Sequence, residues 1–362
     1  MPSPITPKAL RLGDTIAFIS PSARLNHELP AVMSRATTLL TTRGYKVKTF
    51  YTGPDDGIQS SIANRLSEIR SAFTDPTISA IICTIGGPSF TELIPHLLDD
   101  TDLHAHIRSN PKVVVGYSDI TGLHWLLHAT TGLRTFYGPG AIPELGLPDS
   151  ISEHPDSPLS FCAENLFKAI ENATPLGDIP RSQVFYPKTP QFFNHPDNTE
   201  LPDSLPTPKW TWLRSGKATG RLFGGCLTVV ARIAGVKAMV PDWKGRIVFL
   251  ETATGEDDES GNPLARVRAG FADLIAQGVF DEAAGLVVGR PFGYNTDQRR
   301  AQYADVIKGL FCEGRLAEKN PFPILYGVDF GHTIPMVTLP FDAMALMDSD
   351  EDRFAVVEAG VV

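Results

Sequence analysis

The sequence lacks several features that would assign a class of protein at once. It has only four cysteines in 362 residues, too widely spaced for a cysteine zinc site or for the disulfide framework of a small secreted protein. No apolar run approaches the roughly 20 residues that span a bilayer, and the opening residues, MPSPITPKALRLGD, hold no apolar signal core. We therefore expect a soluble, cytoplasmic protein. We expect reduced thiols at Cys83, Cys162, Cys226 and Cys312.

Basic residues are also scarce. The chain has 32 Lys and Arg against 41 Asp and Glu, a net charge of −9, and no basic run interleaved with aromatic residues. We therefore expect neither nucleic acid nor a membrane surface as a partner. The Gly-x-Gly-x-x-Gly and His-Glu-x-x-His patterns are missing too, so a dinucleotide site and a helical zinc site gain no support.

What the chain does have is length and a regular alternation of apolar strands with helical patterns. Its 362 residues, 42% of them apolar, are enough for two domains. Continuous apolar strands between helices are typical of a parallel sheet covered on both faces. Proline, aspartate and serine interrupt this pattern in the middle of the chain. We predict an N-terminal domain at 1–145, a Pro-rich connecting segment at 146–215 and a C-terminal domain at 216–362.

The first candidate for chemistry is Ser118, in the run PKVVVGYSDITG at 111–122. A buried strand that ends in a tight turn with a hydroxyl at its tip can present a serine nucleophile. The run lacks the second glycine of the usual Gly-x-Ser-x-Gly elbow, so an ordinary α/β hydrolase is not implied. From the residues alone, Ser118 is either a nucleophile or the cap of the following helix.

Two further candidates, Glu251 and His332, lie at predicted strand ends, after RIVFL and ILYGVDF. Function gathers at the carboxyl ends of strands in open parallel sheets. A carboxylate that orients a histidine, which in turn accepts the proton of a serine, is a general way to activate a hydroxyl. Taken singly, Glu251 could be a solvated acid and His332 a structural histidine.

A glycine pair, Gly86 and Gly87, follows the apolar run IICTI. Adjacent glycines let the backbone approach a ligand closely and direct N–H groups at developing negative charge. A plain left-handed turn after the strand is the alternative interpretation.

Several collinear motifs together resemble the LD-carboxypeptidase family of serine peptidases, most closely its microcin C self-immunity branch. The resemblance covers nearly the whole chain. Its motifs are LGDTIAFISPSA, TIGGPSFTELIPHL, VVVGYSDITGLHWLLHATTGLRTFYGP, GKATGRLFGGCLTVV, IVFLETATGED, GVFDEAAGLVVGR and FGHTIPMVTLPF.

The resemblance implies a Ser-Glu-His triad at Ser118, Glu251 and His332. It also implies an oxyanion hole made by the backbone N–H of Asp119 with that of Gly86 or Gly87. The expected fold is α/β, a Rossmann-like parallel sheet followed by a smaller β-rich α/β domain, with the active site between them. The family needs no metal or organic cofactor and commonly forms homodimers.

The substrate is less defined. We expect a small peptide or a peptidyl nucleotide, cleaved at an amide bond near a free carboxylate or next to the nucleotide. In the microcin-immunity branch a tryptophan stacks on an adenine-like ring, a role that Trp210 or Trp212 could fill here. Cys226 stands where the family usually has asparagine. A catalytically quiet binding protein on the same scaffold is therefore the competing hypothesis.

Overall fold

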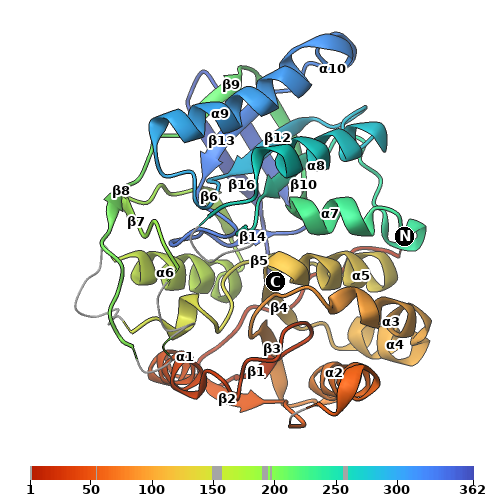
Figure 1. The fold of residues 1–362 in the computed structure, drawn as a ribbon. Coiled ribbons are helices and arrows are strands. Elements are labelled where there is room, and N and C mark those ends of the chain that lie inside the picture. Colours follow the sequence, from red (N-terminus) through yellow and green to blue (C-terminus); the bar gives the residue numbers. More distant parts are fainter. Residues whose placement is uncertain (1, 54, 149–156, 190–194, 196–197, 256–259) are drawn as a thin grey trace.

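The computed structural model describes residues 2–53, 55–148, 157–189, 195, 198–255 and 260–362. Two α/β halves lie against each other: the first, red to yellow, is at the bottom of Figure 1 and the second, green to blue, is at the top. Each half is built around one large sheet. Within the described part of the chain, no helix combines the length and the apolar character needed to cross a membrane.

The first sheet has six strands and is mainly parallel. In sheet order they are β14 (Leu339–Pro340), β5 (Phe136–Tyr137), β4 (Val113–Gly116), β3 (Ile78–Cys83), β1 (Thr15–Ile19) and β2 (Lys46–Thr49). Only β14, which comes from the far end of the chain, runs antiparallel to its neighbour. The central strands are buried on both faces, as their continuous apolar sequences predict.

The helices of the first half include α6 (Pro158–Glu171), which lies where we predicted a connecting segment. They are α1 (Pro30–Thr42), α2 (Gly57–Thr74), α3 (Ile94–Asp99), α4 (Thr101–Ser109), α5 (Thr121–Thr131) and α6 (Pro158–Glu171). Helix α6 lies inside the segment that we took for a connection. Ser157 caps it by accepting a hydrogen bond from the N–H of Ser160 (3.1 Å), and proline occupies its first turn. Prolines and polar residues on either side of this 14-residue helix kept it from being predicted.

The second sheet has eight strands. In order they are β6 (Pro175–Asp178), β16 (Arg353–Ala359), β15 (Met344–Asp348), β10 (Lys217–Cys226), β11 (Ile247–Glu251), β12 (Gly285–Gly289), β13 (Ile324–Val328) and β9 (Thr211–Arg214). Strands β10 to β13 are parallel. The helices of this half are α7 (Leu227–Ile233), α8 (Leu264–Ala276), α9 (Asp297–Ile307) and α10 (Gly314–Lys319), and β7 (Val184–Phe185) pairs with β8 (Leu205–Pro206) apart from both sheets.

The predicted α/β fold, with a parallel first sheet and a β-rich second half, is confirmed. The second sheet nevertheless has more strands than the first, although we expected a smaller unit, because β6 and β9 of the connecting segment join it.

Strand β10 was also not predicted, because glycines are depleted in strands. Here they are needed: a Cβ at Gly224 would lie 1.7 Å from the carbonyl oxygen of Phe249 on β11.

The two halves share one core. Trp125 of α5 packs against Phe223 and Trp243, and its indole N–H donates to the carbonyl of Gly224 (2.8 Å). Arg134, just before β5, donates to the carbonyl of Asp342 (2.9 Å). These contacts fix the strand ends of one sheet relative to those of the other.

Candidate active site

A pocket of about 550 Å³ lies where strand ends from both sheets meet. Ser118 follows β4, Glu251 is the last residue of β11, and His332 follows β13. Ser118 and His332 line the pocket, while Glu251 is buried and bonded to His332. Three strands from two sheets thus bring the three side chains around one cavity.

The backbone at Ser118 adopts an uncommon conformation. Its φ is 62°, in the left-handed region that is sterically costly for residues with a Cβ. Hydrogen bonds hold the turn on both sides. The hydroxyl of Thr121 donates to the carbonyl of Ser118 (2.7 Å), and the N–H of Ser118 donates to the phenol oxygen of Tyr137 (3.2 Å). The turn therefore presents Ser118 to the pocket, and the surrounding hydrogen bonds offset the steric strain of its left-handed backbone.

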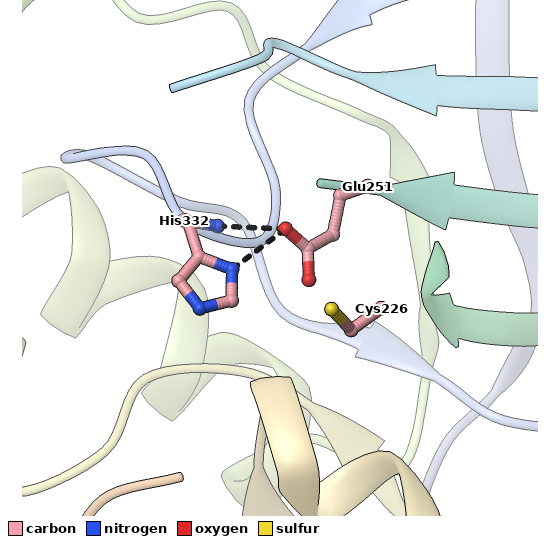
Figure 2. A group of neighbouring side chains, drawn as sticks. All are labelled: Cys226, Glu251 and His332. Atoms are coloured by element: carbon pink, nitrogen blue, oxygen red, sulfur yellow. Dashed lines mark hydrogen bonds and ion pairs between the residues drawn. The ribbon is translucent and has the colours of Figure 1, made fainter. Parts of the chain in front are cut away.

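Glu251 and His332 form a buried pair, shown in Figure 2. Oε2 of Glu251 accepts hydrogen bonds from Nδ1 of His332 (2.8 Å) and from the backbone N–H of the same residue (3.1 Å). Gly331 allows this approach, because a Cβ there would lie 2.1 Å from Cγ of Glu251. One carboxylate oxygen thus fixes both the loop and the imidazole ring.

The pair shifts the pKa values of both groups. Burial by itself raises the pKa of Glu251, but the charge and hydrogen bonds of His332, with the hydrogen bond from Tyr137, bring it below its ordinary value. Burial by itself lowers the pKa of His332, but the carboxylate of Glu251 raises it above its ordinary value. The folded protein therefore stabilises the charged form of each group, including the imidazolium that forms when His332 accepts a proton.

Tyr137 is a residue of this site that the sequence did not single out. Its hydroxyl donates to Oε1 of Glu251 and accepts from the N–H of Ser118. Burial, followed by the charge of Glu251, raises the pKa of Tyr137 well above 10, so the phenol stays protonated. Tyr137 thereby connects the backbone of Ser118 in one half to the carboxylate of the other. A buried tyrosine in the run TFYGP gave no sign of this role.

The imidazole of His332 is also packed from the side. The ring of Tyr117 lies edge-on to it, with centroids 5.0 Å apart and planes at 67°. Because Glu251 binds Nδ1, the nitrogen left for Ser118 is Nε2. Among the described residues the hydrogen-bond chain stops at His332, and no bond reaches Oγ of Ser118. The two side chains share the wall of the pocket without being bonded.

The glycine pair lies against the Ser118 turn. A Cβ at Gly86 would lie 2.8 Å from Oγ of Ser118 and 3.2 Å from the backbone nitrogen of Asp119, so only glycine fits. The carbonyl of Gly86 accepts from the N–H of Ala23 (2.9 Å). Because a trans peptide is planar, the N–H of Gly87 points the opposite way, away from Ala23. The structure thus brings Gly86, Gly87 and Asp119 together beside Ser118.

The carboxylate of Asp119 anchors this corner of the pocket. It accepts from the hydroxyl of Ser22 (2.6 Å) and from the N–H of Phe90 (2.8 Å), and it pairs with Arg232 of α7. Arg232 comes from the second half and lines the pocket. The peptide that follows Ser118 is therefore tied to both halves.

Glu144 is a second buried acid in the pocket wall. It accepts from the hydroxyl of Tyr117 (2.7 Å) and from the N–H of Gly140 (3.0 Å). Burial raises the pKa of Glu144 to about 7, so its charge changes near neutral pH.

Neither predicted tryptophan lies in this pocket, and this corrects our prediction that one of them stacks on substrate there. Trp210 lines a separate pocket, with the guanidinium of Arg181 4.2 Å above its ring. The indole N–H of Trp212 donates to Asp352 (2.8 Å). Sequence could not separate these aromatics from Tyr186 and Phe292, which do line the active pocket.

Comparison with known families covers both halves of the chain. Residues 16–138 match the model described as LD-carboxypeptidase N-terminal domain, and residues 219–347 match the LD-carboxypeptidase C-terminal domain. The chain is 29% identical to the microcin C7 self-immunity protein MccF of Escherichia coli, covering 98% of this chain and 96% of that one. It is 31% identical to a Vibrio cholerae protein that bears a carboxypeptidase name, over 98% of both chains.

Solved structures give the same result. MccF without ligand superposes with a TM-score of 0.82 at 28% identity, covering 99% of this chain and all of that one. MccF in complex with aspartyl sulfamoyl adenosine has the same TM-score, identity and coverage.

The raised pKa of Glu144 makes stability depend on pH in a defined direction. The folded state binds this proton more tightly than the unfolded chain, so the free energy of unfolding falls as pH rises from about 4.5 to about 7. We expect Glu144→Gln to flatten this part of the curve, measured by urea unfolding at several pH values. Equal slopes in the two proteins would show that Glu144 titrates normally.

Proposed function

The chain belongs to the LD-carboxypeptidase family of serine peptidases, and from this we propose that it hydrolyses amide bonds with Ser118, His332 and Glu251 as a triad. The observation that carries the proposal is the Glu251–His332 pair at the wall of the pocket that also holds Ser118. The left-handed conformation of Ser118 supports it, since backbone strain of this kind is common at nucleophile turns.

The proposed reaction starts when Oγ of Ser118 attacks the substrate carbonyl while Nε2 of His332 accepts the hydroxyl proton. Glu251 stabilises the imidazolium that forms. The carbonyl oxygen becomes an oxyanion, which the N–H of Asp119 and that of Gly86 or Gly87 stabilise, a contribution of about 3 kcal/mol per donor.

Collapse of this intermediate breaks the amide bond. His332 returns the proton to the leaving amine, and the acyl group remains on Ser118. A water molecule then attacks the ester, and His332 again accepts and returns the proton, which frees the acid and restores the serine.

For the substrate we propose a small peptide or peptidyl nucleotide that carries a negative charge. Arg232 lines the pocket with its side chain 39% exposed, so it can approach an anionic group while it stays paired with Asp119. Tyr186 and Phe292 offer aromatic surface to a base or an apolar side chain. MccF has been solved with aspartyl sulfamoyl adenosine and with glutamyl sulfamoyl guanosine, while a Pseudomonas aeruginosa relative, 25% identical, is a murein tetrapeptide carboxypeptidase. A homodimer stays a prediction.

A fluorophosphonate probe tests the nucleophile directly. We expect the wild-type chain to gain one phosphonyl group on Ser118, seen by mass spectrometry of the intact protein and of its peptides. Ser118→Ala should gain none, because it lacks the hydroxyl. Thr121→Ser is the matched control, since it keeps Ser118 and a hydroxyl beside it. Labelling elsewhere, or equal labelling of the Ala variant, would contradict the triad.

A hydrolysis assay distinguishes the proposed peptidase from a catalytically quiet binding protein. It also distinguishes the two proposed classes of substrate. We expect wild type, but not Ser118→Ala, to cleave either an LD-tetrapeptide or an aspartyl sulfamoyl adenosine, followed by chromatography of the products. Tight binding of either compound without cleavage by wild type would instead favour the catalytically quiet binder.

Tyr137→Phe tests the connection between the nucleophile turn and the acid. The hydroxyl bonds to the charged Glu251, and such a bond contributes roughly 1.5–3 kcal/mol, so we expect kcat to fall by roughly 10- to 100-fold. KM should change little, because the phenol is buried behind the pocket and is not among the residues that line it. An unchanged kcat, in a variant that unfolds at the same urea concentration as wild type, would show that Tyr137 does not position the triad.

A further inference from the structure

Cys226 brings a third type of metal-binding side chain to the Glu251–His332 pair. Figure 2 shows its sulfur beside the carboxylate, on the side away from the imidazole. One ligand atom from each of the three residues lies within 4.8 Å of the others. Cys226 ends β10, which pairs with β11 so that Cys226 stands directly opposite Glu251. The register of two strands therefore fixes this neighbourhood.

From this cluster we propose that Cys226, Glu251 and His332 bind a soft divalent cation such as Zn²⁺ or Cd²⁺, which blocks the active site reversibly. The inhibition rests on the proposed function, whereas the binding does not. Thiolate, imidazole and carboxylate are the three protein ligands of zinc, and thiolate selects the softer cations over Mg²⁺ and Ca²⁺.

Charge balance favours a divalent cation. A cysteine thiol such as that of Cys226 is neutral near pH 7, whereas the form that binds a metal is the thiolate. When the cation binds, the thiol proton leaves to solvent, and thiolate and carboxylate together neutralise the two positive charges. The neutral imidazole of His332 supplies a nitrogen lone pair, and a water molecule can complete the coordination.

The geometry requires only a small adjustment. Zinc binds sulfur at about 2.3 Å and nitrogen or oxygen at about 2.0–2.2 Å, so two ligand atoms on one ion lie roughly 3.5 Å apart. The 4.8 Å limit on the present separations leaves a closure of roughly 1 Å, within reach of a side-chain rotation of Cys226. Both Cys226 and His332 line the pocket, which gives a cation a route to them.

Binding would remove the groups that the proposed reaction needs. A cation on Glu251 takes the carboxylate that otherwise stabilises the imidazolium, and a cation on His332 occupies a ring nitrogen that otherwise moves the proton. Cys226 itself has no step in that reaction. The Sγ atom of Cys226 contacts the hydroxyl of Thr228 (3.5 Å) and the backbone N–H groups of Thr228 and Val229, and none of these contacts involves the triad.

The binding test is a titration of the full chain with CdCl₂, followed by the near-ultraviolet absorption of the cadmium–thiolate bond. We expect one cadmium per chain, with an affinity at least about tenfold weaker in Cys226→Ser and in Cys226→Asn, since even outer partners of a metal site contribute 10- to 100-fold. Cys312→Ser is the matched control: it removes a half-buried thiol outside the pocket and should bind as wild type does.

Two results would contradict the proposed metal site at Cys226. The first is cadmium absorption of wild-type strength in both Cys226 variants. The second is loss of that absorption in Cys312→Ser, which would place the bound thiolate elsewhere. Circular dichroism of each variant checks that it is folded, and having two replacements at Cys226 guards against one of them failing.

The inhibition test compares each protein with its own rate in the absence of metal. We expect Zn²⁺ to suppress amide hydrolysis by wild type and by Cys312→Ser, with recovery after a chelator, and to suppress Cys226→Ser at least about tenfold less effectively. Cadmium binding by a chain that cleaves no amide would support the metal site and contradict the proposed peptidase. Cleavage by a chain that binds no cadmium would support the peptidase and contradict the metal site.

Discussion

The hydrogen bond between Glu251 and Nδ1 of His332 is the interaction on which the rest of the site depends. A carboxylate that is 1% exposed cannot rely on water, so it needs partners inside the protein. The imidazole and backbone of His332 and the phenol of Tyr137 supply them. The same contacts fix the ring, keep Nδ1 occupied and leave Nε2 for proton transfer. The hydrogen bonds that satisfy the buried carboxylate of Glu251 are thus the same ones that orient His332 as a base.

This arrangement works only if the two halves keep their positions. Ser118 comes from the first sheet, whereas Glu251 and His332 come from the second. Strand β14 crosses back to pair with β5, and Trp125 joins the cores of both halves. Asp119, next to the nucleophile, is paired with Arg232 of the second half. The chain therefore builds its pocket on a shared core, which limits how far the halves can move apart.

Much of this could be predicted from the sequence, for identifiable reasons. Continuous apolar runs gave the parallel strands, and the polar residues at their ends gave Ser118, Glu251 and His332, which the structure gathers around one pocket. The catalytic roles of these residues remain our proposal.

Other features depend on tertiary contacts that no local pattern records. Strand β10 contains glycines that only the close approach of β11 explains. Helix α6 lies inside a stretch whose prolines and polar residues indicate a connecting segment. Trp210 and Trp212 could not be told from pocket aromatics, because an aromatic side chain gives no sign of which cavity it faces. The link through Tyr137 spans 114 residues of sequence and exists only once both sheets have formed.

The most direct test of the central claim is an NMR titration of His332 in wild type and in Glu251→Gln. In wild type we expect a pKa above the ordinary 6.5, because the carboxylate of Glu251 outweighs burial. In the variant the charge is gone and burial remains, so the pKa should fall below 6.5. The same pKa in both proteins would contradict the claim that Glu251 holds and charges the imidazole.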